Sequence, residues 1–210
     1  MKLYTCYSDS HLSLFQDYFL RTFPWSDGFV LDARQIPQWV QDGGVYRAEG
    51  WCDMTDYKTE CAIEACKKEE TFLWSDVDVV FFGTIVKQLV DSLADYDIVG
   101  QFDGEAGLCA GFYVCRGGPK TLALFERVRA IKRQVDFGCD QPALNHVLDM
   151  VKWSYLPSTF WSYGQLQSGR WLGEEPVPFP KNLSMVHANW MVGTDLKAKF
   201  LTMALDRKTH

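Results

Sequence analysis

Two aspartates, Asp76 and Asp78, lie one residue apart within an otherwise apolar segment over residues 71–82. The flanking residues are aromatic or mostly β-branched and Gly83 ends the run, which predicts one buried strand over 71–82. Side chains alternate along a strand, so the two carboxylates face the same way. Because an unpaired buried carboxylate is costly, a cation must meet them. If the strand frays there, both carboxylates can reach one divalent ion, directly or through water.

An Asp-x-Asp pair after an apolar strand resembles the metal-binding motif of the GT-A glycosyltransferases. In that family the pair holds Mn²⁺ or Mg²⁺ against the diphosphate of a sugar nucleotide, and the resemblance implies that Val77, between the aspartates, also contacts the nucleotide. Short Asp-x-Asp matches arise by chance as well. The same pattern is similar to the first motif of haloacid-dehalogenase phosphatases, which need a later acidic pair and usually carry the motif near the N-terminus. Asp95 and Asp97 follow too closely to supply that pair, so we favour the glycosyltransferase.

Composition restricts the class of protein. The chain has 210 residues, of which 47% are hydrophobic and 23% charged, enough for one substantial core over residues 1–210. The net charge of −6 and the lack of a long basic run argue against nucleic-acid binding. The seven cysteines are odd in number and form no Cys-x-x-Cys pair that would suggest zinc, and we expect a reducing compartment.

The chain shows no signal peptide and no apolar run of about 18 residues, so we expect no membrane insertion. A glycosyltransferase without an anchor is unlike the Golgi type. We therefore expect a cytoplasmic enzyme, in the host cell if the protein is viral. The family resemblance further implies one domain of a longer polypeptide with other domains, which would fit the lack of an anchor.

Strands alternate with helices along the chain, which predicts an α/β fold with a mostly parallel central sheet flanked by helices. The resemblance implies the Rossmann-like GT-A fold in a single domain. The expected strands, besides 71–82, cover residues 2–7, 28–31, 97–102, 112–116 and 185–187, and the expected helices 57–68, 84–93, 119–133 and 140–151. Residues 32–54 read mainly as loop, and the Gly- and Pro-rich stretch 164–183 as a long functional loop. In such sheets, ligands bind beyond the carboxyl ends of the strands.

Residues at the end of the first strand and a lysine on a predicted helix are candidates for donor binding. Thr5 and Tyr7 end the first strand, where the resemblance places uracil and ribose, although a structural role is equally consistent with these residues. Lys58 precedes Asp76 by eighteen residues. A helical lysine is usually solvated, but retaining GT-A enzymes carry a basic residue at about this offset that reaches the donor. Arg47 is a weaker alternative for that role.

The segment 104–116 resembles the Asn-Ser-Gly-Phe-Tyr-Val type of segment in the nucleotide-diphospho-sugar transferase family. Gly111 matches its glycine and would let the backbone approach the sugar. Asp103 matches an acidic position that touches the donor sugar in relatives. Cys109 and Ala110 replace the Asn and Ser, so the resemblance implies no polar sugar contact from these two side chains.

Asp140 and Gln141 open a predicted helix. Asp140 could simply cap that helix, with Pro142 in its first turn. The Asp-Gln pair also resembles the one that faces the anomeric carbon in retaining GT-A enzymes. We therefore assign Asp140, Gln141 and Asp103 to the catalytic centre.

A late segment carries His187, then Gly193 six residues on and Lys197 four residues further. A lone His after a strand is more often structural. This spacing, however, resembles the C-terminal signature of retaining GT-A enzymes, where the His is the third metal ligand and the Lys meets the diphosphate. Imidazole with two carboxylates suits Mn²⁺. Gly193 would permit close approach to phosphate, and Asn189 is a further donor-binding candidate.

Together these residues resemble the motifs of the retaining GT-A enzymes, and the resemblance implies a retaining glycosyltransferase that uses Mn²⁺ or Mg²⁺. It would move a hexose or deoxyhexose, of glucose or rhamnose type, from a UDP-sugar to a hydroxyl of a glycan or glycoprotein acceptor. The loop 164–183 would select the acceptor. Two alternatives remain: a sugar-nucleotide hydrolase or nucleotidyltransferase with the same metal clamp, and a non-catalytic sugar-nucleotide-binding module.

Overall fold

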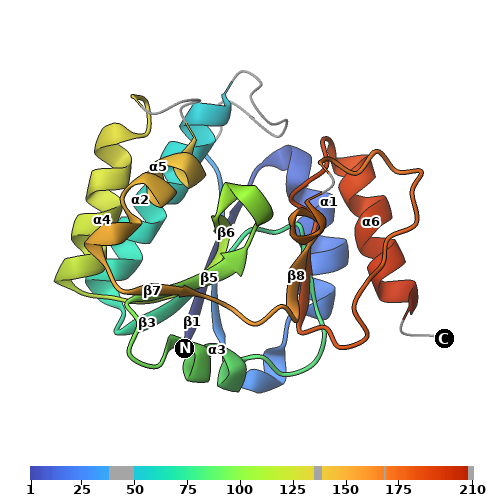
Figure 1. Ribbon diagram of the computed structural model, residues 1–210, viewed down its shortest axis with the longest axis horizontal. Helices are drawn as coiled ribbons and strands as arrows, with labels where there is room; N and C mark the ends of the chain where they lie inside the picture. The colour runs from blue at the N-terminus through green and yellow to red at the C-terminus, as the bar shows by residue number, and fades with distance from the viewer. Residues whose placement is uncertain (38–49, 135–138, 168, 208–210) are drawn as a thin grey trace.

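A six-stranded sheet runs through the centre of the molecule (Figure 1). The computed structural model describes residues 1–37, 50–134, 139–167 and 169–207. The strand order is β2-β1-β3-β6-β5-β7. Only β6 runs antiparallel to its neighbours, while the other adjacent pairs are parallel. The bounds are β1 Lys2–Tyr7, β2 Val30–Gln35, β3 Thr71–Ser75, β5 Ile98–Phe102, β6 Leu108–Arg116 and β7 Trp153–Tyr155. This confirms the expected single α/β domain with a mostly parallel sheet.

A second, three-stranded sheet of order β4-β9-β8 was not expected. It consists of β4 Val79–Phe81, β9 Met185–His187 and β8 Phe160–Ser162. The prediction of one strand over 71–82 is therefore wrong, because its two halves belong to different sheets. The acidic pair occupies the break, where the Asp76 N–H donates to the Gly111 carbonyl (2.7 Å) and the Ala188 N–H donates to the Asp78 carbonyl (2.9 Å). The two carboxylates thus lie at the junction of the sheets.

Helices cover both faces of the main sheet (Figure 1). One face packs against α2 Trp51–Lys68, α4 Pro119–Ile131 and α5 Asp140–His146. The other packs against the π-helical turn Phe15–Leu20 and α3 Val86–Leu93, while α1 Leu12–Leu14 contributes Leu14 to a third apolar cluster beside α6 Thr194–Asp206. Helix α6 contacts the small sheet and closes this third apolar cluster. Short 3-10 helices cover Asp9–His11, Trp25–Asp27, Gly104–Ala106, Leu148–Met150 and Tyr163–Leu166.

Several predicted boundaries are wrong. Helix α2 starts at Trp51, six residues before the expected start, because Gly50 adopts a left-handed φ of +81° that begins the helix there. Strand β2 starts at Val30 and extends to Gln35, so the expected loop over 32–54 is wrong at both of its described ends. The helix expected over 140–151 ends at His146 and gives way to a 3-10 turn. Across the described residues, no helix combines the length and apolar character needed to cross a membrane.

Candidate active site

The junction between β3 and β4 carries the acidic pair, and β9 places His187 beside it. The Asp78 Oδ1 atom lies 3.2 Å from His187 Nε2. One ligand atom from each of Asp76, Asp78 and His187 falls within 4.8 Å of the other two. Asp78 and His187 are only 4% and 1% exposed, whereas Asp76 is half-buried. This arrangement can hold a metal ion, with Asp76 on the open side.

Two features of these residues fit a divalent cation. The buried Nε2 atom of His187 makes no hydrogen bond among the described residues, and Asp78 Oδ1 faces it at 3.2 Å. On β6, a Cβ at Gly111 would lie 2.6 Å from both Asp76 Oδ2 and His187 Cε1, so only glycine leaves these side chains their positions. Two carboxylates and an imidazole are ligand types that divalent cations commonly take.

Two lysines from different helices form ion pairs with the carboxylates of the site. Lys58 of α2 places its Nζ 2.8 Å from Asp76 Oδ1 and 3.5 Å from Asp140 Oδ2, and Lys197 of α6 places its Nζ 2.7 Å from Asp78 Oδ2. Burial alone would lower the pKa of Lys58, but Asp140 and Asp76 raise it well above its usual value. Burial would likewise raise the pKa of Asp78, but Lys197 holds it well below its usual value. These pKa shifts favour the charged forms of Lys58 and Asp78.

Asp103, directly after β5, is 3% exposed and accepts hydrogen bonds on both oxygens. Its Oδ1 accepts from Ser162 Oγ (3.2 Å), Asn189 Nδ2 (2.7 Å) and Trp190 Nε1 (2.6 Å). Its Oδ2 accepts from Gln141 Nε2 (2.9 Å). The carboxylate therefore ties four segments of the chain together next to the metal-ligand set.

Asp140 and Gln141 begin α5, as expected, and each has a distinct environment. The backbone N–H of Gln141 donates to Asp140 Oδ1 (3.0 Å), while Asp140 Oδ2 faces Lys58. The Gln141 side-chain oxygen accepts from the Ala110 N–H (3.1 Å), and its amide nitrogen donates to Asp103. Both ends of the Gln141 amide are thus engaged by the protein.

The predicted nucleoside contacts lie at the carboxyl end of β1. Thr5 is almost fully buried, and its hydroxyl has no hydrogen-bond partner within the described part of the chain. The ring of Tyr7 stacks on Phe15 with centroids 4.2 Å apart. The Val77 side chain lies in the core, so only its backbone is available to a nucleotide. Arg47 lies outside the described residues.

Gly193 precedes α6 with a left-handed φ of +90°, and its carbonyl accepts from the Lys197 N–H (3.2 Å). The start of the long loop 164–183 packs against the same region. Gly164 has no room for a Cβ because it meets the Trp190 indole and the Asp103 carboxylate. The beginning of this loop therefore adjoins the Asp103 hydrogen-bond cluster.

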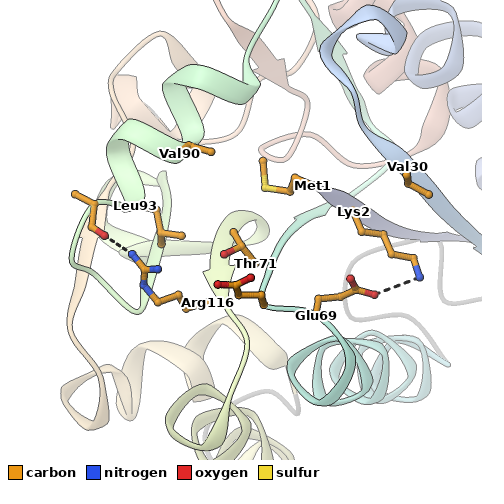
Figure 2. Close-up of a pocket in the computed structure, with 10 residues that line it drawn as sticks. Met1, Lys2, Val30, Glu69, Thr71, Val90, Leu93 and Arg116 are labelled. Atoms are coloured by element: carbon orange, nitrogen blue, oxygen red, sulfur yellow. Dashed lines mark hydrogen bonds and ion pairs between the residues drawn. The ribbon is translucent and has the colours of Figure 1, made fainter.

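A cavity of about 820 Å³ lies at the opposite end of the strands of the main sheet (Figure 2). Met1 and Lys2 at the start of β1, Thr71 at the start of β3 and Arg116 at the end of β6 contribute to its lining. Figure 2 shows the ion pair between Lys2 and Glu69 on its wall. Since the acidic pair follows the opposite end of β3, this cavity is not part of the candidate site.

The junction of the two sheets thus brings together two aspartates, a histidine and two lysines. Residues 38–201 match the sequence profile of the nucleotide-diphospho-sugar transferases, and the chain belongs to this family. Among curated protein sequences, none matches significantly.

Solved structures share this fold. A glycosyltransferase involved in the glycosylation of the major capsid of PBCV-1 is 11% identical, with a TM-score of 0.65 over 97% of this chain and 98% of that one. The glycosyltransferase GlyE of Streptococcus pneumoniae TIGR4 is 14% identical, with a TM-score of 0.59 over 98% and 62% of the two chains. The galactosyltransferase LgtC, in complex with donor and acceptor sugar analogs, is 12% identical, with a TM-score of 0.56 over 90% and 87%.

These similarities show the GT-A fold. From its sequence, the chain looks close to the N-terminal domain of a chlorella-virus enzyme that glycosylates the major capsid protein. The match to the PBCV-1 structure confirms that resemblance at the level of the fold.

Most residues singled out in the sequence lie together around the junction of the two sheets. They are Lys58, Asp76, Asp78, Asp103, Gly111, Asp140, Gln141, His187, Asn189 and Lys197. Sequence reasoning missed Gln101, Ser162 and Trp190, which bind His187 or Asp103. Gln101 had one recognisable signal, a single amide in an otherwise apolar strand.

Proposed function

We propose that the protein transfers a hexose or deoxyhexose, of glucose or rhamnose type, from a UDP-sugar to a hydroxyl of a glycan or glycoprotein acceptor. Transfer would depend on a divalent cation and retain the anomeric configuration. The observation that carries the proposal is the convergence of Asp76, Asp78 and His187 within 4.8 Å, in a chain of the nucleotide-diphospho-sugar transferase family.

Asp76, Asp78 and His187 would hold Mn²⁺ or Mg²⁺, which supplies positive charge against the negative charge that grows on the departing UDP. Lys197, whose Nζ lies 2.7 Å from Asp78, is placed to bind the same diphosphate. Fixed positive charges of this kind stabilise a developing anion without reorganisation, and each typically contributes ~10²–10³ in rate. Gly193 at the start of α6 leaves the backbone open to phosphate oxygens.

On the sugar side, Asp140 and Asp103 would position the donor while the anomeric carbon acquires oxocarbenium character. The Gln141 oxygen accepts from the Ala110 N–H and is thus occupied. The Asp103 carboxylate accepts four hydrogen bonds from protein donors, three of them on Oδ1, so it is poorly placed to act as a nucleophile. These contacts favour attack by the acceptor on the same face as the leaving UDP, whose oxygen takes the acceptor's proton.

The uridine would lie beyond the carboxyl end of β1. The unpartnered Thr5 hydroxyl and the Tyr7 ring, supported from behind by Phe15, offer one polar and one aromatic contact there. Stacking on an aromatic ring typically contributes about 1–3 kcal/mol per base. Lys58, between Asp76 and Asp140, would link the metal and sugar ends of the donor.

The test is release of UDP from a panel of UDP-sugars, with and without Mn²⁺ and with and without glycan acceptors. Wild-type protein is expected to release UDP only with Mn²⁺ and to attach the sugar to an acceptor. Asp78→Asn should lose this activity, whereas Asp91→Asn on the exposed face of α3 should keep it.

Other outcomes separate the alternatives. UDP release without any glycosylated product would indicate a hydrolase. Binding of UDP-sugar without turnover would indicate a binding module, a reading that Cys109 and Ala110 in place of polar residues would then explain.

A further inference from the structure

Gln101 is a fully buried amide in the middle of β5, 0% exposed, between apolar neighbours. Its Nε2 donates to the carbonyl of Phe160 (3.2 Å) on β8. Its Oε1 lies 2.9 Å from Nδ1 of His187 on β9. Gln101 therefore connects the main sheet to two strands of the small sheet, one of which carries the histidine of the proposed metal site.

The Phe160 carbonyl decides which way the amide of Gln101 faces. A carbonyl oxygen can only accept, so the NH₂ group of Gln101 must point to Phe160 and its oxygen to His187. Nδ1 of His187 must then carry the proton in order to donate to that oxygen. The Cys109 sulfur, 3.8 Å from Nδ1, is a more distant and weaker partner.

With the proton on Nδ1, the neutral ring presents a lone pair at Nε2. This atom is buried, lies 3.2 Å from Asp78 Oδ1 and has no hydrogen-bond partner in the described structure. Two electron-rich atoms facing each other in a buried site are complementary to a cation between them. An unsatisfied buried polar atom is costly, so this tautomer needs an external restraint, which Gln101 provides.

We propose that Gln101 is a positioning residue that holds His187 as the neutral Nδ1–H tautomer and so keeps Nε2 free for the divalent cation. The inference rests on the proposed metal site. Residues that orient a ligating histidine typically change metal affinity by about 10–100-fold when they are removed.

The first test is Mn²⁺ binding by calorimetry to the purified chain without donor. Gln101→Leu removes the acceptor and is expected to raise the Kd for Mn²⁺ by about 10–100-fold. Gln101→Glu keeps an oxygen toward Nδ1 and should restore affinity to within a few-fold of the wild type. An unchanged Kd in Gln101→Leu would overturn the inference.

Gln165 offers a matched control, because its Nε2 donates to the same Phe160 carbonyl (3.0 Å). Gln165→Leu removes an equivalent amide from this carbonyl but leaves the contact between Gln101 and His187 intact. It should therefore leave the Kd for Mn²⁺ unchanged. A loss equal to that in Gln101→Leu would assign the effect to Phe160 and the surrounding packing, and would contradict the proposal.

The tautomer itself is measured in the metal-free chain by NMR of ¹⁵N-labelled histidine, with His187 assigned through His187→Gln. Wild-type protein should show His187 protonated at Nδ1, and Gln101→Leu should shift the proton toward Nε2. An Nε2–H signal in the wild type would refute the inference even if Mn²⁺ binds. Absence of Mn²⁺ binding by the wild type would instead refute the proposed function, since the NMR measurement does not depend on it.

Discussion

Oδ1 of Asp78 and Nε2 of His187 lie 3.2 Å apart because the short strands β4 and β9 pair in a single register. Val79, which follows the acidic pair, sits opposite His187 in that register, and the Ala188 N–H donates to the Asp78 carbonyl. The backbone pairing of β4 and β9 thus places Asp78 and His187 side by side, independently of their side-chain contacts. The small sheet is therefore the element that assembles the candidate metal site.

Replacement of Lys58 by methionine separates metal binding from catalysis. The change removes the positive charge beside Asp76 and Asp140, so Mn²⁺ should bind as tightly as in the wild type or more tightly. The kcat for transfer should fall by ~10²–10³, as expected for a lost electrostatic contact to the donor. Calorimetry and steady-state kinetics measure the two effects.

Lys67→Met, on the exposed face of the same helix, is the control and should change neither quantity. If Lys58→Met lost Mn²⁺ binding together with activity, Lys58 would be a structural partner of Asp76 rather than a donor contact.

Gly111→Ala tests the space between the metal ligands. The new Cβ would lie 2.6 Å from Asp76 Oδ2 and from His187 Cε1, so these side chains must move apart. We expect the Mn²⁺ affinity to fall at least about 10-fold, with an overpacking cost of about 1–3 kcal/mol in the free energy of unfolding. Gly100→Ala creates a comparable 2.6 Å contact, but with the Leu108 side chain. The Gly100→Ala variant should lose stability and keep its Mn²⁺ affinity. Wild-type Mn²⁺ affinity in Gly111→Ala would argue against a metal site beside Gly111.

Asp103→Asn tests whether the four donors around this carboxylate hold the sugar side of the site. In either orientation the new NH₂ group faces a donor, Gln141 on one side or Asn189 and Trp190 on the other. We expect a loss of about 2–3 kcal/mol in the free energy of unfolding, measured by urea denaturation. The exposed neighbour Glu105→Gln should stay within about 0.5 kcal/mol of the wild type. Wild-type stability in Asp103→Asn would mean that these hydrogen bonds do not form in solution.

Glu64 on α2 predicts a pH dependence of stability. The Arg34 guanidinium, 2.6 Å away, and the Lys68 ammonium lower the pKa of Glu64 from 4.5 to about 2. The folded state thus favours the charged form. The stabilisation is fully present above about pH 4.5 and is lost as the pH falls toward 2. Since the side chain is 35% exposed, it amounts to about 1 kcal/mol or less.

Urea denaturation of wild type and Glu64→Gln across this pH range provides the measurement. Their difference in unfolding free energy should be constant near neutral pH and shrink below about pH 4.5. Glu126→Gln, exposed on α4, should show no such trend. A difference that persists undiminished in acid would contradict the assigned pKa shift.

The residues of the candidate site were predictable where charge interrupts an apolar pattern. Asp76 and Asp78 interrupt a run of aromatic and β-branched residues, and His187 follows another short apolar strand. Such positions indicate a function because burial without a partner is costly. Their order along the chain resembles that of a known family, and the sequence profile confirms that the chain belongs to this family.

The small sheet could not be predicted, for a physical reason. The pattern over 71–82 indicates an extended chain but not which sheet each half joins, because the partners of β4 lie more than 100 residues downstream. Gln101 and Ser162 are single polar residues in apolar strands, and Trp190 resembles any other aromatic residue. Their roles follow only from tertiary contacts with His187 and Asp103.

The most direct test of the metal-dependent transferase is a crystal of the protein with Mn²⁺ and UDP, measured for the anomalous scattering of manganese. We predict one strong peak at about 2.0–2.3 Å from a carboxylate oxygen of Asp78 and from Nε2 of His187, with the diphosphate against Lys197. A crystal with ordered UDP whose manganese peak lies away from these side chains, or which has no peak, would contradict the account.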